Sequence, residues 1–520
     1  MSLERYRPGF HYSPARNWLN DPNGLVWFDG EYHLFYQYNP DGTDWGNMSW
    51  GHAVSPDLVS WVELPVAIPC TDSEHVFSGS VVVDHRNTSG FGVDGAPAMV
   101  AIYTAHDPAS GRQAQALAVS HDRGRSWSRY AGNPVLDVRS PAFRDPKVSW
   151  YGPGGYWVMV VAQADQRIAQ FYASDDLLNW RHLSDFGPAG ATAGVWECPD
   201  LFPLPVEGEE DETAWVLVVS VGDGGVAGGS GVQYFVGDFD GTTFGLGKES
   251  LVVGDGADGV AAAMWLDFGA DYYAAVSFGD TPDGERVLIG WMSNWAYAAV
   301  TPTKGFRGAM SFPRVHRLAR VAGRLRLVQQ PAPALETLRA DFSHYGHLEL
   351  NGGEHELQEH HDGEHLDICA SFTPGTAKRF GIRLRGVEGE ETEVGYDASD
   401  GSLYVDRTLS GQTDLHPEFP GVHRAPLTLH DGRVTFRLLV DVASVEVFGG
   451  IGESVITDQI FPNPGGRRVD LFAEDGTVYV EELCLISLNT ASAWPHGFNL
   501  HDTGVPDSSP ILRRSSPSGN

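Results

Sequence analysis

A short phrase recurs through the first 315 residues, and it constrains the fold more than any other feature of the sequence. It reads Ser-x-Asp, a short loop and then tryptophan, and a weaker fourth copy has phenylalanine in the tryptophan place. The aromatic positions are spaced by 66, 53 and 64 residues. A period of this length indicates a repeated structural unit. The copies are VSPDLVSW (54–61), VSHDRGRSW (119–127), ASDDLLNW (173–180) and VGDFDGTTF (236–244).

The segments between the copies consist of short strand-like runs. AMVAIYTA, YWVMVVAQ, WVLVVSV and RVLIGWMS are examples, and helical periodicity is scarce. About four short strands in each period of 50–65 residues is typical of a propeller blade. About 310 residues then predict five blades, with an array of β-sandwiches as the alternative. In a propeller the innermost strands converge on one axis, so residues far apart in sequence can meet there.

The sequence pattern changes after residue 315, which predicts a second domain. Residues 316–345 have Leu and Arg at helix-compatible spacing and a PAPA break, so we expect a linker with one short helix. Alternating strands return in residues 346–490 and predict a β-sandwich. Residues 491–520 are polar and rich in Pro and Ser, which favours a disordered tail. The fold class is therefore all-β, a five-bladed β-propeller (1–315) followed by a C-terminal β-sandwich.

Three acidic residues share a local design in which a proline follows closely. Asp21 lies in NDPNG, Asp145 in FRDPK and Glu197 in WECPD. Proline disfavours the helical region for the residue before it, so an extended and stiff backbone is expected at these positions. Stiff positioning suits a catalytic group. A single Asp-Pro is usually only a turn, as we expect for Asp107, but three on different blades could meet at the axis.

Paired carboxylates beside aromatic rings point to glycoside hydrolysis. That reaction needs one protonated acid and one ionised acid, and aromatic faces stack on sugars. The net charge of −33 argues against nucleic acid or an anionic membrane as a partner. The sequence contains no run of 18 apolar residues, so no membrane span is predicted. The first residues lack the apolar core of a signal peptide, which leaves the compartment open between cytoplasmic and secreted after processing.

Other motifs carry less weight. In HELQEHHDGEH (355–365), His355 and His360 are five residues apart in a strand-like segment, which does not fit a zinc motif. The Gly-rich run 222–231 lacks nucleotide-binding spacing, and Ser120-His121-Asp122 belongs to the structural repeat. We interpret Cys198, beside Glu197, as ordinary strand packing. No metal and no cofactor is expected, while a homo-oligomer is possible.

Several motifs occur in an order that resembles glycoside hydrolase family 32, the family of invertases, levanases and inulinases. They are WLNDPNG, FYQYNP, WGNMSWGHAVSPDLVSW, FSGS, FRDPK, ECPD, WMSNW and FRGAMSFPR, with weaker agreement to about residue 490. The resemblance implies a five-bladed propeller followed by a β-sandwich. It also implies Asp21 as nucleophile, Glu197 as general acid and base, and Asp145 as stabiliser of the transition state. Carboxyls of residues 21 and 197 about 5–5.5 Å apart, the retaining spacing, are then expected.

The resemblance further implies a set of substrate-contacting residues and a substrate class. Trp295 is preferred over Trp291 for the last of these positions. The implied activity is release of fructose from fructan (levan or inulin) with some action on sucrose. A sucrose-directed invertase, a fructosyltransferase, an inactive glycan-binding propeller and a related arabinan- or xylan-acting propeller are the alternatives. The substrate-contacting residues are Trp18, Asn20, Gln37, Trp45, Phe77, Ser78, Arg144 and Trp295.

Overall fold

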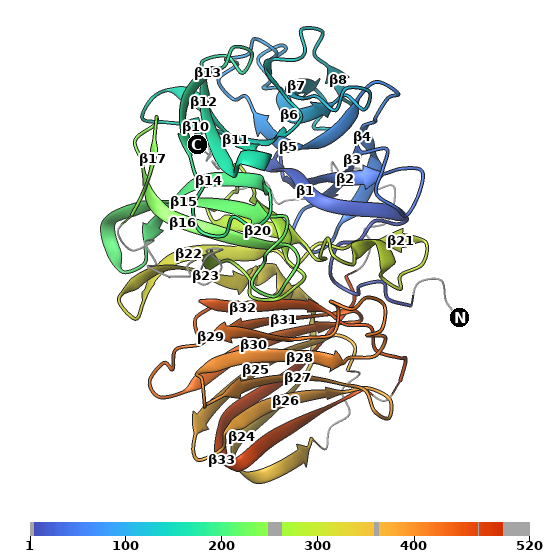
Figure 1. Cartoon of the computed structure of the whole chain (residues 1–520), viewed down its shortest axis with the longest axis vertical. Coiled ribbons are helices and arrows are strands. Elements are labelled where there is room, and N and C mark those ends of the chain that lie inside the picture. The colour runs from blue at the N-terminus through green and yellow to red at the C-terminus, as the bar shows by residue number, and fades with distance from the viewer. Residues whose placement is uncertain (1–4, 248–262, 358–362, 466, 492–520) are drawn as a thin grey trace, which may run out of the picture.

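The computed structural model describes residues 5–247, 263–357, 363–465 and 467–491. They form two all-β domains, with the propeller above and the sandwich below in Figure 1. The only helices in these ranges are the short 3-10 turns η1 (Ala164–Gln166), η4 (Ala298–Val300) and η5 (Pro333–Leu338). None of them has the length and apolar content that a membrane crossing requires. The predicted disordered tail lies outside the described residues, except for Ala491.

The propeller has five blades of four antiparallel strands, as the repeat predicts. Within each blade the strands follow one another in sequence from the axis outward, except that β21 (Phe306–Arg307), between β20 and β22 in the chain, pairs with β1 of the first blade. The fourth and fifth blades are joined by a parallel bridge between Val206 and Leu318. The strands are β1 (Asn17–Phe28), β2 (Glu31–Asn39), β3 (Ser49–Ser55), β4 (Val62–Ile68); β5 (His75–Val83), β6 (Met99–His106), β7 (Gln113–Ser120), β8 (Ser128–Arg129) with β9 (Leu136–Ser140); β10 (Phe143–Tyr151), β11 (Tyr156–Gln163), β12 (Ile168–Ser174), β13 (Arg181–Phe186); β14 (Trp196–Val206), β15 (Glu209–Val221), β16 (Gly231–Phe239), β17 (Phe244–Leu246) with β18 (Met264–Trp265); and β19 (Tyr273–Ser277), β20 (Arg286–Trp291), β22 (Arg314–Val321), β23 (Arg324–Pro331).

The repeated phrase is the loop between the third and fourth strands of a blade. In the first copy, Asp57 Oδ1 accepts hydrogen bonds from the backbone N–H groups of residues 59 and 60 at 2.9 and 2.7 Å. The indole of Trp61 donates to the carbonyl of Leu58 at 3.0 Å. Asp176 with Trp180 repeats this arrangement, and Asp122 with Trp127 forms a close variant of it. The phrase recurs because the Asp and Trp side chains of each copy hydrogen-bond the backbone groups of their own turn.

The prediction of a linker over residues 316–345 is wrong for most of its length. Strands β22 and β23 form a hairpin that supplies the outer half of the fifth blade. Its turn residues Ala322 and Gly323 have φ of 48° and 78°, the left-handed pair that a tight two-residue hairpin requires. The Leu and Arg residues alternate across a strand rather than along a helix. Only η5 corresponds to the expected short helix.

The second domain is a sandwich of two sheets that share their longest strands. The first half of β33 pairs with β26 and its second half pairs with β25, while β24 runs beside both. Gly352, Gly353 and Asp475 have positive φ where these strands pass from one sheet to the other. The strands are β24 (Arg339–Glu356), β25 (Leu366–Pro374), β26 (Arg379–Arg385), β27 (Glu391–Asp397), β28 (Ser402–Leu409), β29 (Val422–Pro426), β30 (Val434–Asp441), β31 (Ser444–Gly449), β32 (Ser454–Gln459) and β33 (Arg468–Leu488).

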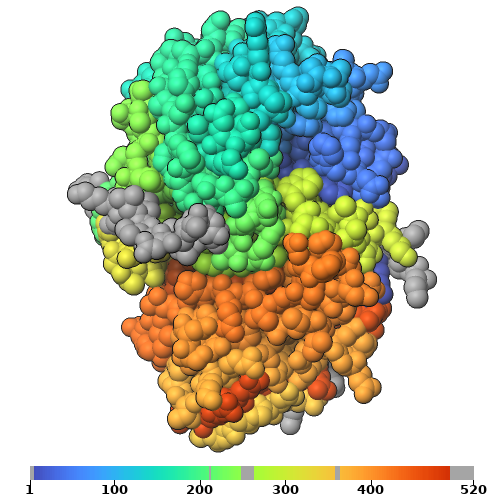
Figure 2. Space-filling model, in the orientation of Figure 1, coloured from blue at the N-terminus to red at the C-terminus, as the bar shows by residue number. Residues whose placement is uncertain are grey.

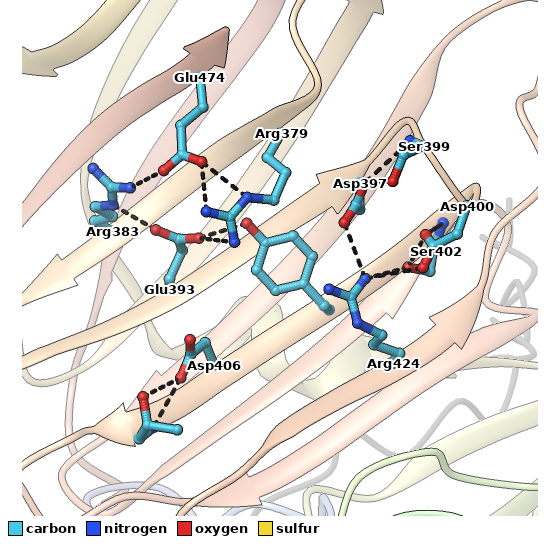
Figure 3. Close-up of polar contacts among 12 residues, drawn as sticks. Arg379, Arg383, Glu393, Asp397, Ser399, Asp400, Ser402, Asp406, Arg424 and Glu474 are labelled. Atoms are coloured by element: carbon cyan, nitrogen blue, oxygen red, sulfur yellow. Dashed lines mark hydrogen bonds and ion pairs between the residues drawn. The ribbon is translucent and has the colours of Figure 1, made fainter.

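One face of the sandwich carries a ladder of ion pairs across its strands (Figure 3). Arg379 and Arg383 both pair with Glu474, and Arg383 also donates to Glu393 at 2.6 Å. Arg424 reaches Asp397 at 3.3 Å. These pairs are partly exposed, and pairs of this kind contribute little individually. The ladder therefore belongs to the sheet surface rather than to a binding site.

The two domains pack closely, with the sandwich against the fourth and fifth blades (Figures 1 and 2). The propeller segment 267–271 runs beside the outer strand β32 and covers that edge. Asp267 accepts a hydrogen bond from the backbone N–H of Thr457, and Asp271 accepts one from that of Gln459. A covered edge cannot pair with another chain.

A buried ionic network holds this interface. Arg314 on β22 pairs with Asp267 of the propeller and with Glu446 of the sandwich, and all three side chains are buried. The ring of His11 bridges Asp441 and Glu446 at 2.7 Å each. Although burial opposes the charged ring, these carboxylates raise the pKa of His11 to about 9. The same contacts bring the pKa of Glu446 down to about 2 against the opposing effect of burial, with Arg314 the leading cause.

We predict that Arg314→Met destabilises the protein strongly, because it leaves the buried Asp267 without its cation and Glu446 with only His11. The expected loss is about 3–5 kcal/mol in the free energy of unfolding, measured by denaturant titration at pH 7. Arg317→Met on the same strand is the matched control, since Arg317 and its partner Glu207 are about half exposed. That control should cost less than about 1 kcal/mol. Equal losses for the two variants would contradict the role of the network.

Candidate active site

The innermost strand of every blade has a register shift near the same end. The shifts lie between Leu19 and Pro22 on β1, Phe77 and Gly79 on β5, residues 144 and 147 on β10, 197 and 200 on β14, and 273 and 276 on β19. A bulge re-aims side chains and is common next to active sites. The bulges and the strand residues beside them supply the polar groups that converge on the propeller axis.

The expected extended backbone before proline is wrong at two of the three acidic motifs. Asp145, before Pro146, has φ of 66°, and Cys198, before Pro199, has φ of 47°. Ala274 in the fifth blade has φ of 53° at the equivalent bulge. Left-handed backbone is costly for residues other than glycine, and such strain concentrates at functional sites. Stiffness here comes from the bulge, not from an extended strand.

Asp21 is held by donors on both carboxylate oxygens. The amide of Asn20 donates to Oδ1 at 2.9 Å, and the hydroxyl of Ser78 donates to Oδ2 at 2.7 Å. The indole of Trp18 donates to Asn20 Oδ1 at 2.7 Å, which fixes the orientation of that amide. Burial and the nearby charge of Glu197 raise the pKa of Asp21, and the donors from Ser78 and Asn20 offset part of the rise.

Glu197 is held by a guanidinium on one oxygen and a phenol on the other. Arg144 donates through Nε and Nη2 to Oε1 at 2.9 and 2.7 Å. The hydroxyl of Tyr273 donates to Oε2. These contacts link the third, fourth and fifth blades at one carboxylate.

Asp145 lines the same site as the other two acids and is almost fully buried. Its backbone N–H donates to Thr104 Oγ1 at 2.9 Å, and its Oδ2 accepts from the backbone N–H of Cys198 at 3.0 Å. Burial raises its pKa to about 7. Arg144 opposes the rise, whereas the charges of the two other acids add to it.

Cys198 packs in the core of the propeller, as interpreted, and its thiol also contacts two of the three acids. Its Sγ lies 3.6 Å from Asp21 Oδ2 and 3.7 Å from Asp145 Oδ2. Burial, followed by the surrounding carboxylates, raises the pKa of the thiol well above its usual range. It therefore remains a neutral, weak donor shared by two carboxylates.

The three acids line one cavity of about 400 Å³. Trp45, half of which is exposed, and Phe77 and Trp295 supply rings to its wall. Trp18 is buried behind the wall and stacks on Trp295 at 6.1 Å, so it supports the cavity without lining it. Trp291 is also fully buried, in line with the preference for Trp295. The lining residues are Asn20, Asp21, Gln37, Trp45, Phe77, Ser78, Gln113, Arg144, Asp145, Glu197 and Trp295.

Two models of one protein family match almost all of the described chain. Residues 11–331 match the model for the glycosyl hydrolases family 32 N-terminal domain, and residues 334–488 match the family 32 C-terminal model. The chain belongs to glycoside hydrolase family 32.

Its relatives agree with this family over nearly the whole chain. A levanase of Bacillus subtilis is 46% identical over 489 residues, which are 93% of this chain and 70% of the relative. The crystal structure of an exo-inulinase from Aspergillus awamori has a TM-score of 0.87 at 39% identity and covers 94% of this chain and 99% of that one. A β-fructofuranosidase of Schwanniomyces occidentalis complexed with fructosyl-erythritol has a TM-score of 0.83 at 31% identity, with 94% and 98% covered.

Two residues of this family 32 site carried no signal in the sequence. Gln113 lines the cavity and its Oε1 lies 3.4 Å from Arg144 Nη1. Tyr273 reaches Glu197 from the fifth blade. Neither belongs to a recognisable motif, and only the position of Tyr273 at the start of an innermost strand could have indicated its role.

The described residues include only part of the His-rich segment in which we expected no metal site. His360 of the HELQEHHDGEH segment lies outside them. His344, Glu482 and Cys484 form their one group of three potential ligands, on the surface of the sandwich. It lies on β24 and β33, so it supplies nothing to the catalytic cavity.

We predict that Asp145→Asn stabilises the protein at neutral pH. When the pKa of a carboxyl is higher in the folded than in the unfolded chain, the folded state loses stability as pH rises above the unfolded pKa. The loss levels off once pH exceeds the folded pKa. The gain should thus be absent near pH 4, grow up to about pH 7, and reach about 1–3 kcal/mol. Thermal unfolding midpoints measured across this pH range test it.

Asp84→Asn is the control of opposite sign. Asp84 is buried and accepts four hydrogen bonds from Thr88 and Ser89, which lower its pKa despite the opposing effect of burial. Its contribution is present at neutral pH and is lost in acid, so this variant should be less stable at pH 7 and approach the wild type as pH falls. An Asp145→Asn gain that did not depend on pH would contradict the electrostatic explanation.

Proposed function

We propose that the protein is a retaining glycoside hydrolase that releases fructose from the ends of levan or inulin, with some hydrolysis of sucrose. The observation that carries the proposal is the convergence of Asp21, Asp145 and Glu197 from three blades on one ring-lined cavity. The levanase and exo-inulinase relatives support a β-fructoside as the substrate.

In this proposal Asp21 is the nucleophile. Its carboxylate attacks the anomeric carbon of a fructosyl unit while the bond to the leaving oxygen breaks and Glu197 gives that oxygen a proton. Water then attacks the fructosyl-enzyme, Glu197 takes its proton, and Asp21 is released. The donors from Asn20 and Ser78 favour the ionised form of Asp21 that attack requires. The carboxyl separation of about 5–5.5 Å and retention of configuration remain predictions.

The remaining lining groups orient the sugar. Asp145 and Arg144 bind fructose hydroxyls, and Gln37, Trp45, Phe77 and Trp295 complete the first subsite, with Trp18 acting through Asn20 and Trp295. Sugar hydroxyls that hydrogen-bond Asp145 favour its ionised form and draw Arg144 toward it, since the two already lie 4.0 Å apart. Glu197 then loses its cation and carries the proton needed by the leaving group.

The choice of substrate stays open among related activities. A levanbiose-producing levanase of Bacillus subtilis is 36% identical, so relatives differ in the products they release. A sucrose-directed invertase or a fructosyltransferase with the same intermediate is the alternative. Initial rates on sucrose, inulin and levan, with products separated by chain length, distinguish them. Fructose alone from levan indicates exo action, early oligosaccharides indicate endo action, and kestose-type products indicate transfer.

We predict that Asp21→Ala reduces turnover below about 1% of the wild-type rate while the fold is kept, since the nucleophile is lost. Steady-state rates on sucrose and inulin, with circular dichroism as the folding check, test this. Asp107→Ala is the control, because Asp107 also precedes proline but caps an exposed turn. It should retain full activity, and an active Asp21→Ala would remove Asp21 from the role.

Glu197→Ala should affect substrates according to their leaving groups. An aryl fructoside with an excellent leaving group needs no proton, so its first step should survive, whereas inulin hydrolysis should fall by about 10²–10⁴-fold. Burst kinetics of aryl alcohol release measure the first step separately. If the burst disappeared as completely as inulin hydrolysis, Glu197 would not be the acid.

A further inference from the structure

A second cavity, of about 630 Å³, lies further along the same innermost strands. Four of these strands, β1, β5, β10 and β14, line the catalytic cavity first and the second cavity two to four residues later. On β1 the order is Asp21 and then Leu25, and on β14 it is Glu197 and then Asp200. At about 3.3 Å per residue the nearest lining residues of the two cavities are separated by roughly 7–13 Å along the axis. The second cavity therefore lies toward the opposite mouth of the propeller.

A polar layer separates the two cavities. Lys147 Nζ lies 3.6 Å from Asp200 Oδ2 and donates to the carbonyl of Ser277. Asp200 accepts from the backbone N–H of Ser277 at 2.7 Å. These residues come from three blades, and the side chains of Lys147 and Asp200 are 13% and 1% exposed. They give the second cavity a polar floor.

Aromatic rings form the wall of the second cavity. Trp150 packs edge-on against Trp157 at 5.1 Å, and Tyr151 contacts Trp215 at 6.1 Å. Trp150, Tyr151 and Trp215 are partly exposed, so part of each ring is open to the cavity. The Arg86 guanidinium lies 4.6 Å from the centre of the Trp150 ring.

The positive and negative charges of the lining nearly balance. One buried N–H donor, on Arg286, lacks a hydrogen-bond partner among the described residues. Arg86, Lys147 and Arg286 against Asp200 and Asp280 give three positive and two negative charges, a sum of +1. Nη1 of Arg286 donates to Ser277 Oγ at 3.2 Å. Its Nε is buried and has no hydrogen-bond partner in the part of the chain that the structure describes. A buried donor of this kind is costly unless a ligand or water satisfies it.

We propose that this cavity is a second carbohydrate-binding site, which takes a neutral oligosaccharide segment of the polymeric substrate. Ring faces suit the apolar faces of sugar rings, while Arg286 and the polar floor suit hydroxyl groups. A net charge of −33 on the whole chain disfavours polyanions. The identity of the sugar as fructan rests on the proposed function. A chain bound here lies outside the reach of the catalytic acids, so it raises the local concentration of ends at the catalytic mouth.

The test is binding of polymer to inactive protein. Asp21→Ala protein is run in native gels that contain levan or inulin, with and without saturating sucrose to fill the catalytic cavity. We expect retardation that persists with sucrose and that weakens roughly 2–10-fold when Trp150→Ala and Trp215→Ala are added. Phe342→Ala, which removes a ring that is 61% exposed on the sandwich, is the matched control and should change nothing.

Thr213→Arg tests the same site without removing a packed ring. Thr213 is exposed at the cavity wall, and a longer side chain there fills the opening. In otherwise wild-type protein it should raise KM for polymer by a similar factor and leave kinetics on sucrose unchanged. Retardation that sucrose abolishes would overturn the proposal, and so would retardation unaffected by the two tryptophan substitutions together with a polymer KM unaffected by Thr213→Arg. Because the gel assay does not need turnover, a protein that binds fructan without cleaving it fails the proposed function and not this one.

Discussion

The convergence of five innermost strands on one axis is the constraint on which the rest of the structure depends. Strands this close to an axis present only a few side chains to the space between them, and bulges decide which ones. The bulges, all near the same end, bring Asp21 into contact with Ser78 and Cys198, and bring Cys198 into contact with Asp145. Further along the same strands the side chains form a polar layer and then a second cavity.

The number of cations beside each group of buried carboxyls only partly distinguishes the candidate catalytic acids from the structural ones. Three carboxyls face one guanidinium in the catalytic cavity, so at least one of them is driven to bind a proton. At the domain interface Asp441 and Glu446 are matched by His11 and Arg314, and their pKa values are low. Burial nevertheless raises the pKa of Asp271, which pairs with Arg407. A raised pKa becomes evidence for function only where a cavity gives a ligand access.

The sequence could predict the blades because each repeat closes its own turn, as Asp57 and Trp61 do. It could also predict most of the catalytic cavity, since those residues belong to contiguous motifs. It failed at the hairpin of residues 314–331, where apolar spacing fits a helix or a strand until the turn at Ala322 is considered. It could not find Tyr273 or Gln113, because their roles follow from their places around the axis. The left-handed backbone at Asp145 was missed for a similar reason, since a bulge outweighed the preference that proline imposes.

The sandwich has a physical connection to the catalytic cavity, although none of its described residues lines that cavity. Arg407 of the sandwich pairs with Asp271, and both side chains are fully buried. Asp271 also accepts from the hydroxyl of Tyr297 and the backbone N–H of Gln459, so this point of the propeller is fixed from several sides. Two residues later the chain reaches Tyr273, which donates to Glu197. Because small displacements of a catalytic group cost large factors in rate, anchoring the start of β19 positions the donor on which the orientation of Glu197 depends.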